Sequence, residues 1–125
     1  MSPSPTPNTM VKTESTPISK QYLSYTKEAL ENTKRNSRVL FFYASWCPTC
    51  IPANADFEKN ISMLPSDVTV IRVNYNDPDT DTEEKALATK YGITYQHTYV
   101  QIDSSGNEVT KWNGGATKEL LAKIK

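Results

Sequence analysis

The sequence predicts one α/β domain whose sheet contains both parallel and antiparallel strands. Residues 39–43 and 68–74 are short apolar runs rich in β-branched or aromatic side chains, which is typical of buried strands, and a helix-like alternation separates them. A helical connection of this kind makes two strands parallel. Residues 97–102 and 108–112 are also strand-like and flank the turn-rich segment 103–107, which indicates an antiparallel hairpin.

The elements ahead of the first long strand are short. Residues 18–22 are expected to form an edge strand. Residues 24–34 have the pattern of a surface helix, which either Ser24 or Thr26 can cap. Inward contacts are expected from Tyr22, Leu23, Tyr25 and Leu30.

A helix should follow the strand 39–43, begin at about Pro48 and run to about Asn60. Pro48 suits its first position, where a missing N–H costs nothing. Pro52 should bend the same helix, because a proline inside a helix removes one backbone hydrogen bond.

Two further helices are expected in the second half of the chain. One passes through residues 85–90 and stops at Gly92. Its start has capping-box spacing twice, in Thr80 with Glu83 and in Asp81 with Glu84. The other is the last helix, capped by Thr117. Its apolar face is formed by Leu120, Leu121 and Ile124.

Cys47 and Cys50 lie where the strand 39–43 turns into its helix. The first turn of a helix has unpaired N–H groups and the positive end of the helix dipole, which together stabilise a thiolate. Cys50 is three residues further on and therefore falls on the same face, close enough for a disulfide. We expect Cys47 to be presented to solvent and Cys50 to be shielded by the turn above it.

The run Trp46-Cys47-Pro48-Thr49-Cys50, preceded by Ala44-Ser45 and a hydrophobic strand, resembles the active site of the thioredoxin-fold family of dithiol/disulfide oxidoreductases. The element order from about Tyr22 onward matches that fold. The resemblance implies a three-layer sandwich with a central mixed sheet between helices. It also implies that Cys47 is the attacking nucleophile, that Cys50 resolves the mixed disulfide, and that no cofactor is needed beyond this redox-active pair.

The sequence departs from the family at three positions. His97 occupies the place of the family's cis-proline, and a cis bond before a non-proline residue costs about 2.5–4 kcal/mol, so the Gln96–His97 bond should be trans. Phe41 stands where the family has a buried aspartate, and Ile51 where it often has a lysine. Together with Pro48, which is similar to more oxidising bacterial enzymes, these changes put thioredoxin-like reducing power in doubt.

Three interpretations of His97 remain open. It could tune the thiols, either as a cation that stabilises the Cys47 thiolate or as a neutral base that relays a proton. It could complete a copper site with Cys47 and Cys50, so that the protein would be a copper chaperone, the alternative function. It could also be a loop residue without chemistry. Zinc normally needs four protein ligands, and the chain has two cysteines and one histidine.

The expected partners are protein thiols and disulfides, with a membrane electron donor or acceptor as a further partner. The residues expected to frame the sulfur and contact the substrate are Trp46, Pro48, Thr49, Gln96, His97 and Thr98. The backbone of the last three should hold the partner chain in extended form.

Composition limits the other possibilities. The 125 residues suffice for one domain, which we expect to be monomeric, and 14 basic residues balance 14 acidic ones, so nucleic acid is not an expected partner. Residues 1–17 form a Ser/Thr/Pro-rich segment that predicts a disordered tether ahead of a domain at 18–125. A tether suggests an extracytoplasmic bacterial domain whose signal or lipid anchor was removed, with Met1 added; a cytoplasmic protein with a disordered start is the alternative.

Overall fold

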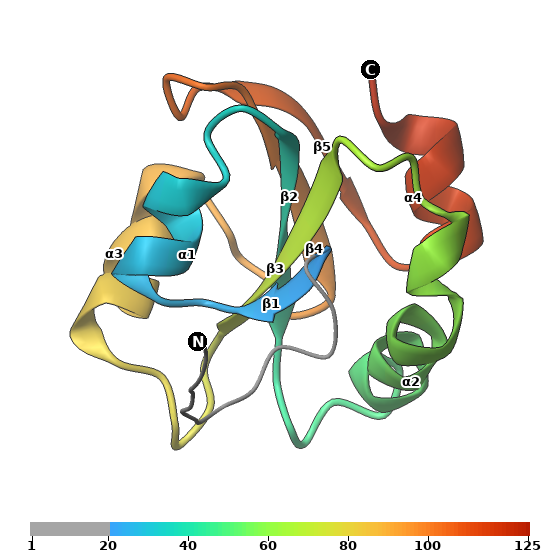
Figure 1. Cartoon of the computed structure of the whole chain (residues 1–125). Helices are drawn as coiled ribbons and strands as arrows, with labels where there is room; N and C mark the ends of the chain where they lie inside the picture. Colours follow the sequence, from blue (N-terminus) through green and yellow to red (C-terminus); the bar gives the residue numbers. More distant parts are fainter. Residues whose placement is uncertain (1–20) are drawn as a thin grey trace, which may run out of the picture.

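Five strands form one mixed sheet in the computed structural model, which describes residues 21–125 (Figure 1). The strand order across the sheet is β1-β3-β2-β4-β5. The strands are β1 (Tyr22–Ser24), β2 (Ser37–Tyr43), β3 (Val68–Asn74), β4 (Thr98–Ile102) and β5 (Glu108–Asn113). β1, β3 and β2 are parallel, whereas β4 runs antiparallel to β2 and to β5. The predicted tether at 1–17 lies outside the described residues.

Helices cover both faces of the sheet. α1 (Lys27–Asn32) and α3 (Thr82–Lys90) lie on one side in Figure 1, and α2 (Cys50–Asn60) and α4 (Thr117–Lys123) lie on the other. A short 3-10 turn, Ile61–Met63, follows α2. The predicted three-layer sandwich with a central mixed sheet is confirmed. None of the helices in residues 21–125 has both the length and the apolar character needed to cross a membrane.

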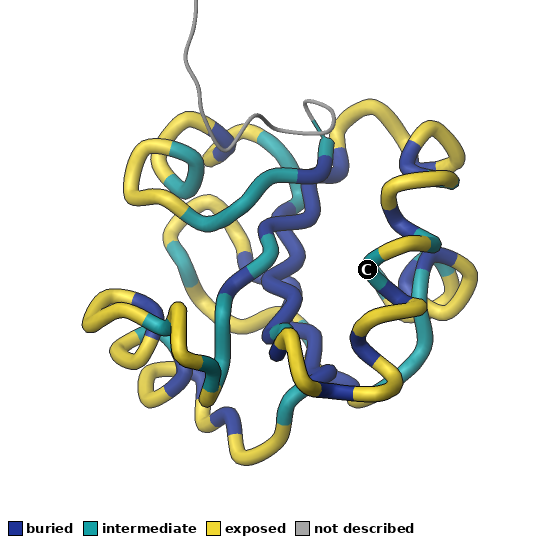
Figure 2. Tube along the Cα trace, turned by 90° about the horizontal axis from the view of Figure 1, so that it is seen from below, coloured by how far each residue is buried: buried dark blue, intermediate teal, exposed yellow. Residues whose placement is uncertain are grey.

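β2 lies at the centre of the sheet and divides the core into two. Val39 and Phe41 belong to the cluster that packs under α2 and α4, and Leu40 and Phe42 belong to the cluster under α1 and α3. All four side chains are fully buried. Figure 2 shows this central column of buried residues, with the exposed sides of the helices around it. Burial on both faces explains why the strand is a continuous apolar run rather than an alternating one.

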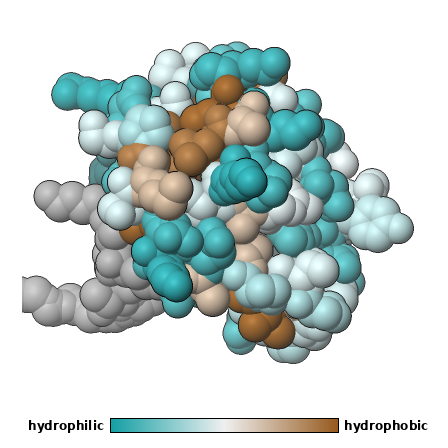
Figure 3. Space-filling model, turned by 90° about the vertical axis from the view of Figure 1, so that its right-hand side faces the viewer, coloured by the Kyte–Doolittle hydropathy of each residue, from teal (hydrophilic) through white to brown (hydrophobic). Residues whose placement is uncertain are grey.

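The outer surface over α2 and α4 is mostly hydrophilic. In Figure 3 its hydrophobic areas are small and separated from one another. Two large apolar side chains, those of Ile51 in α2 and Met63 in the 3-10 turn after it, are more than half exposed. This face therefore presents isolated apolar residues rather than one continuous apolar patch.

Most predicted elements are present, with shifted ends. β3 has the bounds predicted for it, and the parallel pair and the hairpin are confirmed. The edge strand lies later than predicted, at Tyr22–Ser24, and residues 18–20 are outside the described residues. Thr26 is the cap of α1, since its hydroxyl accepts the N–H of Ala29 at 2.9 Å. Asp81 and Glu84 form the capping box of α3.

The prediction that Thr117 caps the last helix is wrong. α4 begins at Thr117, and Ala116 is the capping residue. The Thr117 hydroxyl donates instead to the carboxylate of Asp56 in α2, at 2.5 Å, and the Thr117 N–H donates to the same oxygen at 3.3 Å. An acid 61 residues away thus replaces the expected local cap.

Candidate active site

The two cysteines lie in the turn between β2 and α2. The helix begins at Cys50, and Cys47 precedes it, so that the Cys50 N–H donates to the Cys47 sulfur at 3.1 Å. The sulfur thus meets an N–H group of the helix start, as predicted. Pro48 lies in the turn two residues before the helix, not at its first position. Pro52 is the third helical residue. The N–H groups on either side of it, those of Ile51 and Ala53, donate to the carbonyls of Cys47 and Thr49, both at 3.3 Å, so the one backbone bond that proline cannot make is missing, as predicted.

Neither thiol is exposed. The exposed fraction is 0% for both Cys47 and Cys50, and both belong to the core cluster under α2 and α4. The prediction that Cys47 is presented to solvent is therefore wrong for this conformation. Less protein surrounds Cys47 than Cys50.

The two thiols differ in acidity. Burial by itself would raise the pKa of Cys47, but hydrogen bonds from the side chains and backbone of Cys50 and Thr49 outweigh it and lower the pKa. Burial raises the pKa of Cys50 to about 12, and its hydrogen bond to the Cys47 sulfur adds to the effect. Cys47 is consequently the more acidic thiol of the pair.

His97 links three segments of the site. Its Nδ1 lies 2.8 Å from the Thr49 hydroxyl, and its Nε2 lies 2.7 Å from the carbonyl oxygen of Gly115. The Thr49 hydroxyl is in turn 3.4 Å from the Cys47 sulfur. The ring is 8% exposed and packs against Phe41 and Tyr99, with centroids 5.8 and 5.7 Å away. His97 therefore connects to Cys47 through the side chain of Thr49.

A model of thioredoxin-like domains matches residues 24–125, most of the chain. The chain belongs to the thioredoxin-like family. Among solved structures, it resembles thioredoxin f from spinach chloroplast, with a TM-score of 0.65 at 20% identity over 84% of each chain. A thioredoxin-like protein from Edwardsiella tarda gives 0.60 at 23% identity over 81% of this chain and 94% of that one.

A thioredoxin from Fasciola hepatica is 27% identical, with a TM-score of 0.59 over 77% of this chain and 85% of that one. No curated protein gives a significant match. The likenesses establish the thioredoxin fold, and the family membership connects the two cysteines with dithiol/disulfide chemistry.

In this thioredoxin-like protein, three aromatic rings belong to the same buried cluster as the two thiols. Phe41 is fully buried and stacks on Tyr99, with ring centroids 4.9 Å apart, and Phe57 packs against both rings. The described residues place no carboxylate in hydrogen-bond contact with either sulfur. At the position where the family has a buried aspartate, Phe41 therefore contributes apolar packing.

The histidine loop is built differently from a cis-proline loop. Residues 21–125 contain no cis peptide bond, so the predicted trans bond before His97 is confirmed. His97 has φ of 62°, in the left-handed region. Its N–H donates to the Phe42 carbonyl at 2.7 Å, and its carbonyl accepts the Gly114 N–H at 2.8 Å. Both the N–H and the carbonyl of His97 are therefore bonded within the domain. Neither of these two groups is free to pair with the backbone of an extended partner chain.

The copper alternative gains no support from the geometry. The ligand atoms of Cys47, Cys50 and His97 lie within 4.8 Å of one another. However, each ring nitrogen of His97 already has a hydrogen-bond partner, and a metal would have to displace one of them. The described residues bring no fourth His, Cys, Asp or Glu to this group.

A second loop clamps the turn that carries the cysteines. The Trp46 indole donates to the carbonyl of Asn76 at 2.8 Å, and the Ser45 N–H donates to the Asp77 carboxylate at 2.6 Å. Burial would raise the pKa of Asp77, but the hydrogen bonds from Ser45 and Asp79 lower it. Nothing in the sequence pattern had singled out Asn76 or Asp77, because the contacts join residues about 30 positions apart.

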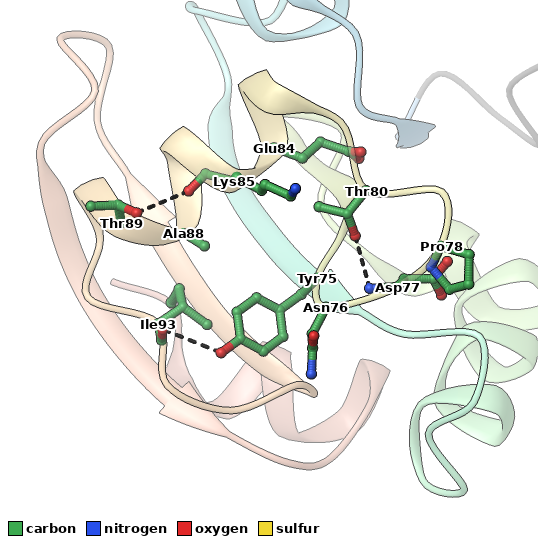
Figure 4. Close-up of a pocket in the computed structure, with 10 residues that line it drawn as sticks. All are labelled: Tyr75, Asn76, Asp77, Pro78, Thr80, Glu84, Lys85, Ala88, Thr89 and Ile93. Carbon is green, nitrogen blue, oxygen red and sulfur yellow. Dashed lines mark hydrogen bonds between the residues drawn. The ribbon is translucent and has the colours of Figure 1, made fainter.

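A hollow lies behind this loop, away from the thiols. It has a volume of about 610 Å³, and Figure 4 shows its walls between the loop and α3, with the Tyr75 hydroxyl turned toward the Ile93 carbonyl. Glu84 of its lining is committed to the backbone N–H groups of Asn74 and Asp81. The hollow contains neither cysteine nor His97 and adds no group to the thiol chemistry.

The predicted substrate residues fall into two groups. Trp46, Pro48 and Thr49 are exposed, and Gln96 is partly buried. Thr98, like His97, is buried, and its hydroxyl donates to the Tyr95 carbonyl at 2.8 Å. The first group can meet a partner directly, whereas the buried pair shapes the loop from within.

Proposed function

We propose that this protein exchanges disulfides with protein substrates through Cys47 and Cys50. The proposal rests on one hydrogen bond. At the start of α2, the Cys50 N–H donates to the Cys47 sulfur at 3.1 Å. A thiolate is the reactive form of cysteine, and donors at a helix start stabilise it. The lowered pKa of Cys47 and the raised pKa of Cys50 support one attacking and one resolving thiol.

The exchange proceeds in two balanced steps. The Cys47 thiolate attacks one sulfur of a substrate disulfide, that S–S bond breaks, and the departing sulfur leaves as a thiolate that takes up a proton. Cys50 then loses its proton and attacks the Cys47 sulfur, which releases the second substrate thiol and forms the Cys47–Cys50 disulfide. Two electrons pass from the protein to the substrate, and the reverse sequence oxidises a substrate dithiol.

A partner has to displace the cover over Cys47 before it can react. The proposed contacts at the surface are the side chains of Trp46, Pro48 and Thr49, with Gln96 on the facing loop. His97 and Thr98 hold that loop in shape. The Trp46 indole is tied to Asn76, so the aromatic surface beside the thiol is positioned before a partner arrives.

The test is turnover on a protein disulfide. Reduction of insulin by the dithiol form, or oxidation of a reduced test protein by the disulfide form, should occur with the wild-type chain and disappear in Cys47→Ser. Cys50→Ser is the matched control, since it should retain the first step and trap a mixed disulfide that a gel without reductant reveals. Turnover retained in Cys47→Ser would reject the proposal.

A further inference from the structure

We propose that the Thr49 hydroxyl carries a proton between the Cys47 thiol and His97, and that the Gly115 carbonyl sets the direction of this relay. The inference rests on the proposed disulfide exchange and assigns its proton acceptor. It makes Thr49 and His97 members of the reacting site, in addition to the two cysteines.

The hydrogen-bond roles follow from the chemistry of the Gly115 oxygen. A carbonyl oxygen can only accept, so the Nε2 atom that lies 2.7 Å from it must carry a hydrogen. The Tyr99 hydroxyl donates to the same oxygen at 2.6 Å, which fixes that carbonyl in position. In the neutral ring the other nitrogen, Nδ1, is then an acceptor.

Thr49 has to donate to that acceptor. Its hydroxyl is 2.8 Å from Nδ1, so the O–H points to the ring, and the oxygen remains free to accept from the Cys47 S–H at 3.4 Å. The chain of donors therefore runs from Cys47 through Thr49 and His97 to the Gly115 carbonyl. Each of these three hydrogen bonds therefore has one assigned donor and one assigned acceptor.

The side chain of Thr49 also does not cap its helix, although its position would allow it. Thr49 is the N-cap residue of α2, where a threonine oxygen normally accepts an N–H of the first helical turn. Here it makes no such capping bond. The hydroxyl instead lies between the sulfur and the imidazole, which is the placement that a relay requires and that helix capping does not explain.

The transfer conserves atoms and charge. The S–H bond of Cys47 breaks as an O–H bond forms on Thr49, while the original Thr49 O–H bond breaks and an N–H bond forms on Nδ1. The products are a Cys47 thiolate, an intact Thr49 hydroxyl that now donates to the sulfur, and a His97 imidazolium that keeps its bond to Gly115. When Cys47 is later released from a mixed disulfide, the reverse transfer returns the proton.

Burial makes an internal acceptor useful. Cys47 is 0% exposed and His97 is 8% exposed, so in the closed conformation solvent has little access to the thiol proton. The ring faces these titratable groups: Cys47 and Cys50, Asp56 from α2, Tyr99 from β4 and Glu119 from α4. Asp56 and Glu119 line the same hollow as His97.

The decisive experiment compares Thr49→Val with Thr49→Ser. Valine keeps the shape of threonine without the hydroxyl, whereas serine keeps the hydroxyl. Following the ultraviolet absorbance of the thiolate against pH, we expect Thr49→Val to raise the measured pKa of Cys47 and to slow alkylation at neutral pH by about tenfold. Thr49→Ser should restore most of the wild-type rate.

Two further results complete the test. His97→Ala should produce a similar loss, and the double variant should lose no more than either single one, because both substitutions break the same relay. At alkaline pH, where the thiol ionises without help, insulin turnover by Thr49→Val should recover. Wild-type titration in Thr49→Val, or additive losses in the double variant, would overturn the relay. Failure of the wild-type chain to turn over insulin would instead reject the proposed function.

Discussion

His97 has a backbone conformation that few residues adopt. Its φ of 62° is in the left-handed region, and its N–H is bonded to Phe42. Side chains other than glycine occupy this region rarely and at a cost of order 1–3 kcal/mol. The bonds of its ring to Thr49 and Gly115 offset that cost and hold the loop against the turn that carries the cysteines.

Replacing His97 by proline, the residue typical of the family at this position, should therefore destabilise the domain. Proline has φ near −65° and no N–H, so the present loop conformation and the bond to Phe42 are both lost. We expect the free energy of unfolding in urea to fall by about 2–4 kcal/mol. His97→Asn, which tolerates the left-handed region, is the control and should lose less. Unchanged stability of His97→Pro would contradict the structure of this loop.

At the scale of elements, hydrogen bonds attach the turn that carries the cysteines to the loop between β3 and α3. Ser45 donates to the Asp77 carboxylate and Trp46 donates to Asn76, so the end of β2 cannot move independently of the end of β3. The hydrogen bonds from Ser45 and Asp79 lower the pKa of Asp77, because these donors favour the ionised carboxyl.

The attachment predicts a dependence of stability on pH. A carboxyl whose pKa is lower in the folded state contributes stability above its unfolded pKa of about 4 and loses it as the pH falls through the folded value. Asp77→Asn should therefore be less stable than wild type at neutral pH and approach it in acid. Urea unfolding over a series of pH values measures both curves. A difference that stayed constant into acid would show that the charge of Asp77 is not involved.

At the scale of the whole molecule, the thioredoxin-like sandwich closes over its two cysteines. Cys47 and Cys50 belong to the same buried cluster as Phe41 and Phe57, and less protein surrounds Cys47 than Cys50. The proposed reaction at Cys47 would thus depend on a local opening, whereas Cys50 is surrounded by more protein.

The closed site predicts that access limits modification by a small alkylating reagent. Cys47 of the folded, reduced protein should react more slowly, by about tenfold or more, than the unfolded chain corrected for its thiolate fraction. Peptide mapping by mass spectrometry should locate the label on Cys47 well before Cys50. Equal rates for folded and unfolded protein would show that Cys47 is not covered in solution.

The sequence alone determined the elements that depend on neighbouring residues. The strand at 68–74 and the central run at 39–43 follow from local runs of apolar and β-branched residues, and the hairpin follows from two strand-like runs around a turn-rich segment. The pair Asp81 and Glu84 forms its capping box within one turn. The sequence also predicted that the two cysteines, three residues apart, lie between a strand and a helix. These features need only short-range geometry, so a local pattern can encode them.

Only the tertiary structure decided how the site is assembled. The bond between His97 and Thr49 spans 48 residues, that between Thr117 and Asp56 spans 61, and the burial of Cys47 depends on how the sheet, α2 and the surrounding loops close together. Such contacts depend on which segments the fold brings side by side. No local pattern contains that information, and this is why the predicted cap at Thr117 and the predicted exposure of Cys47 were wrong.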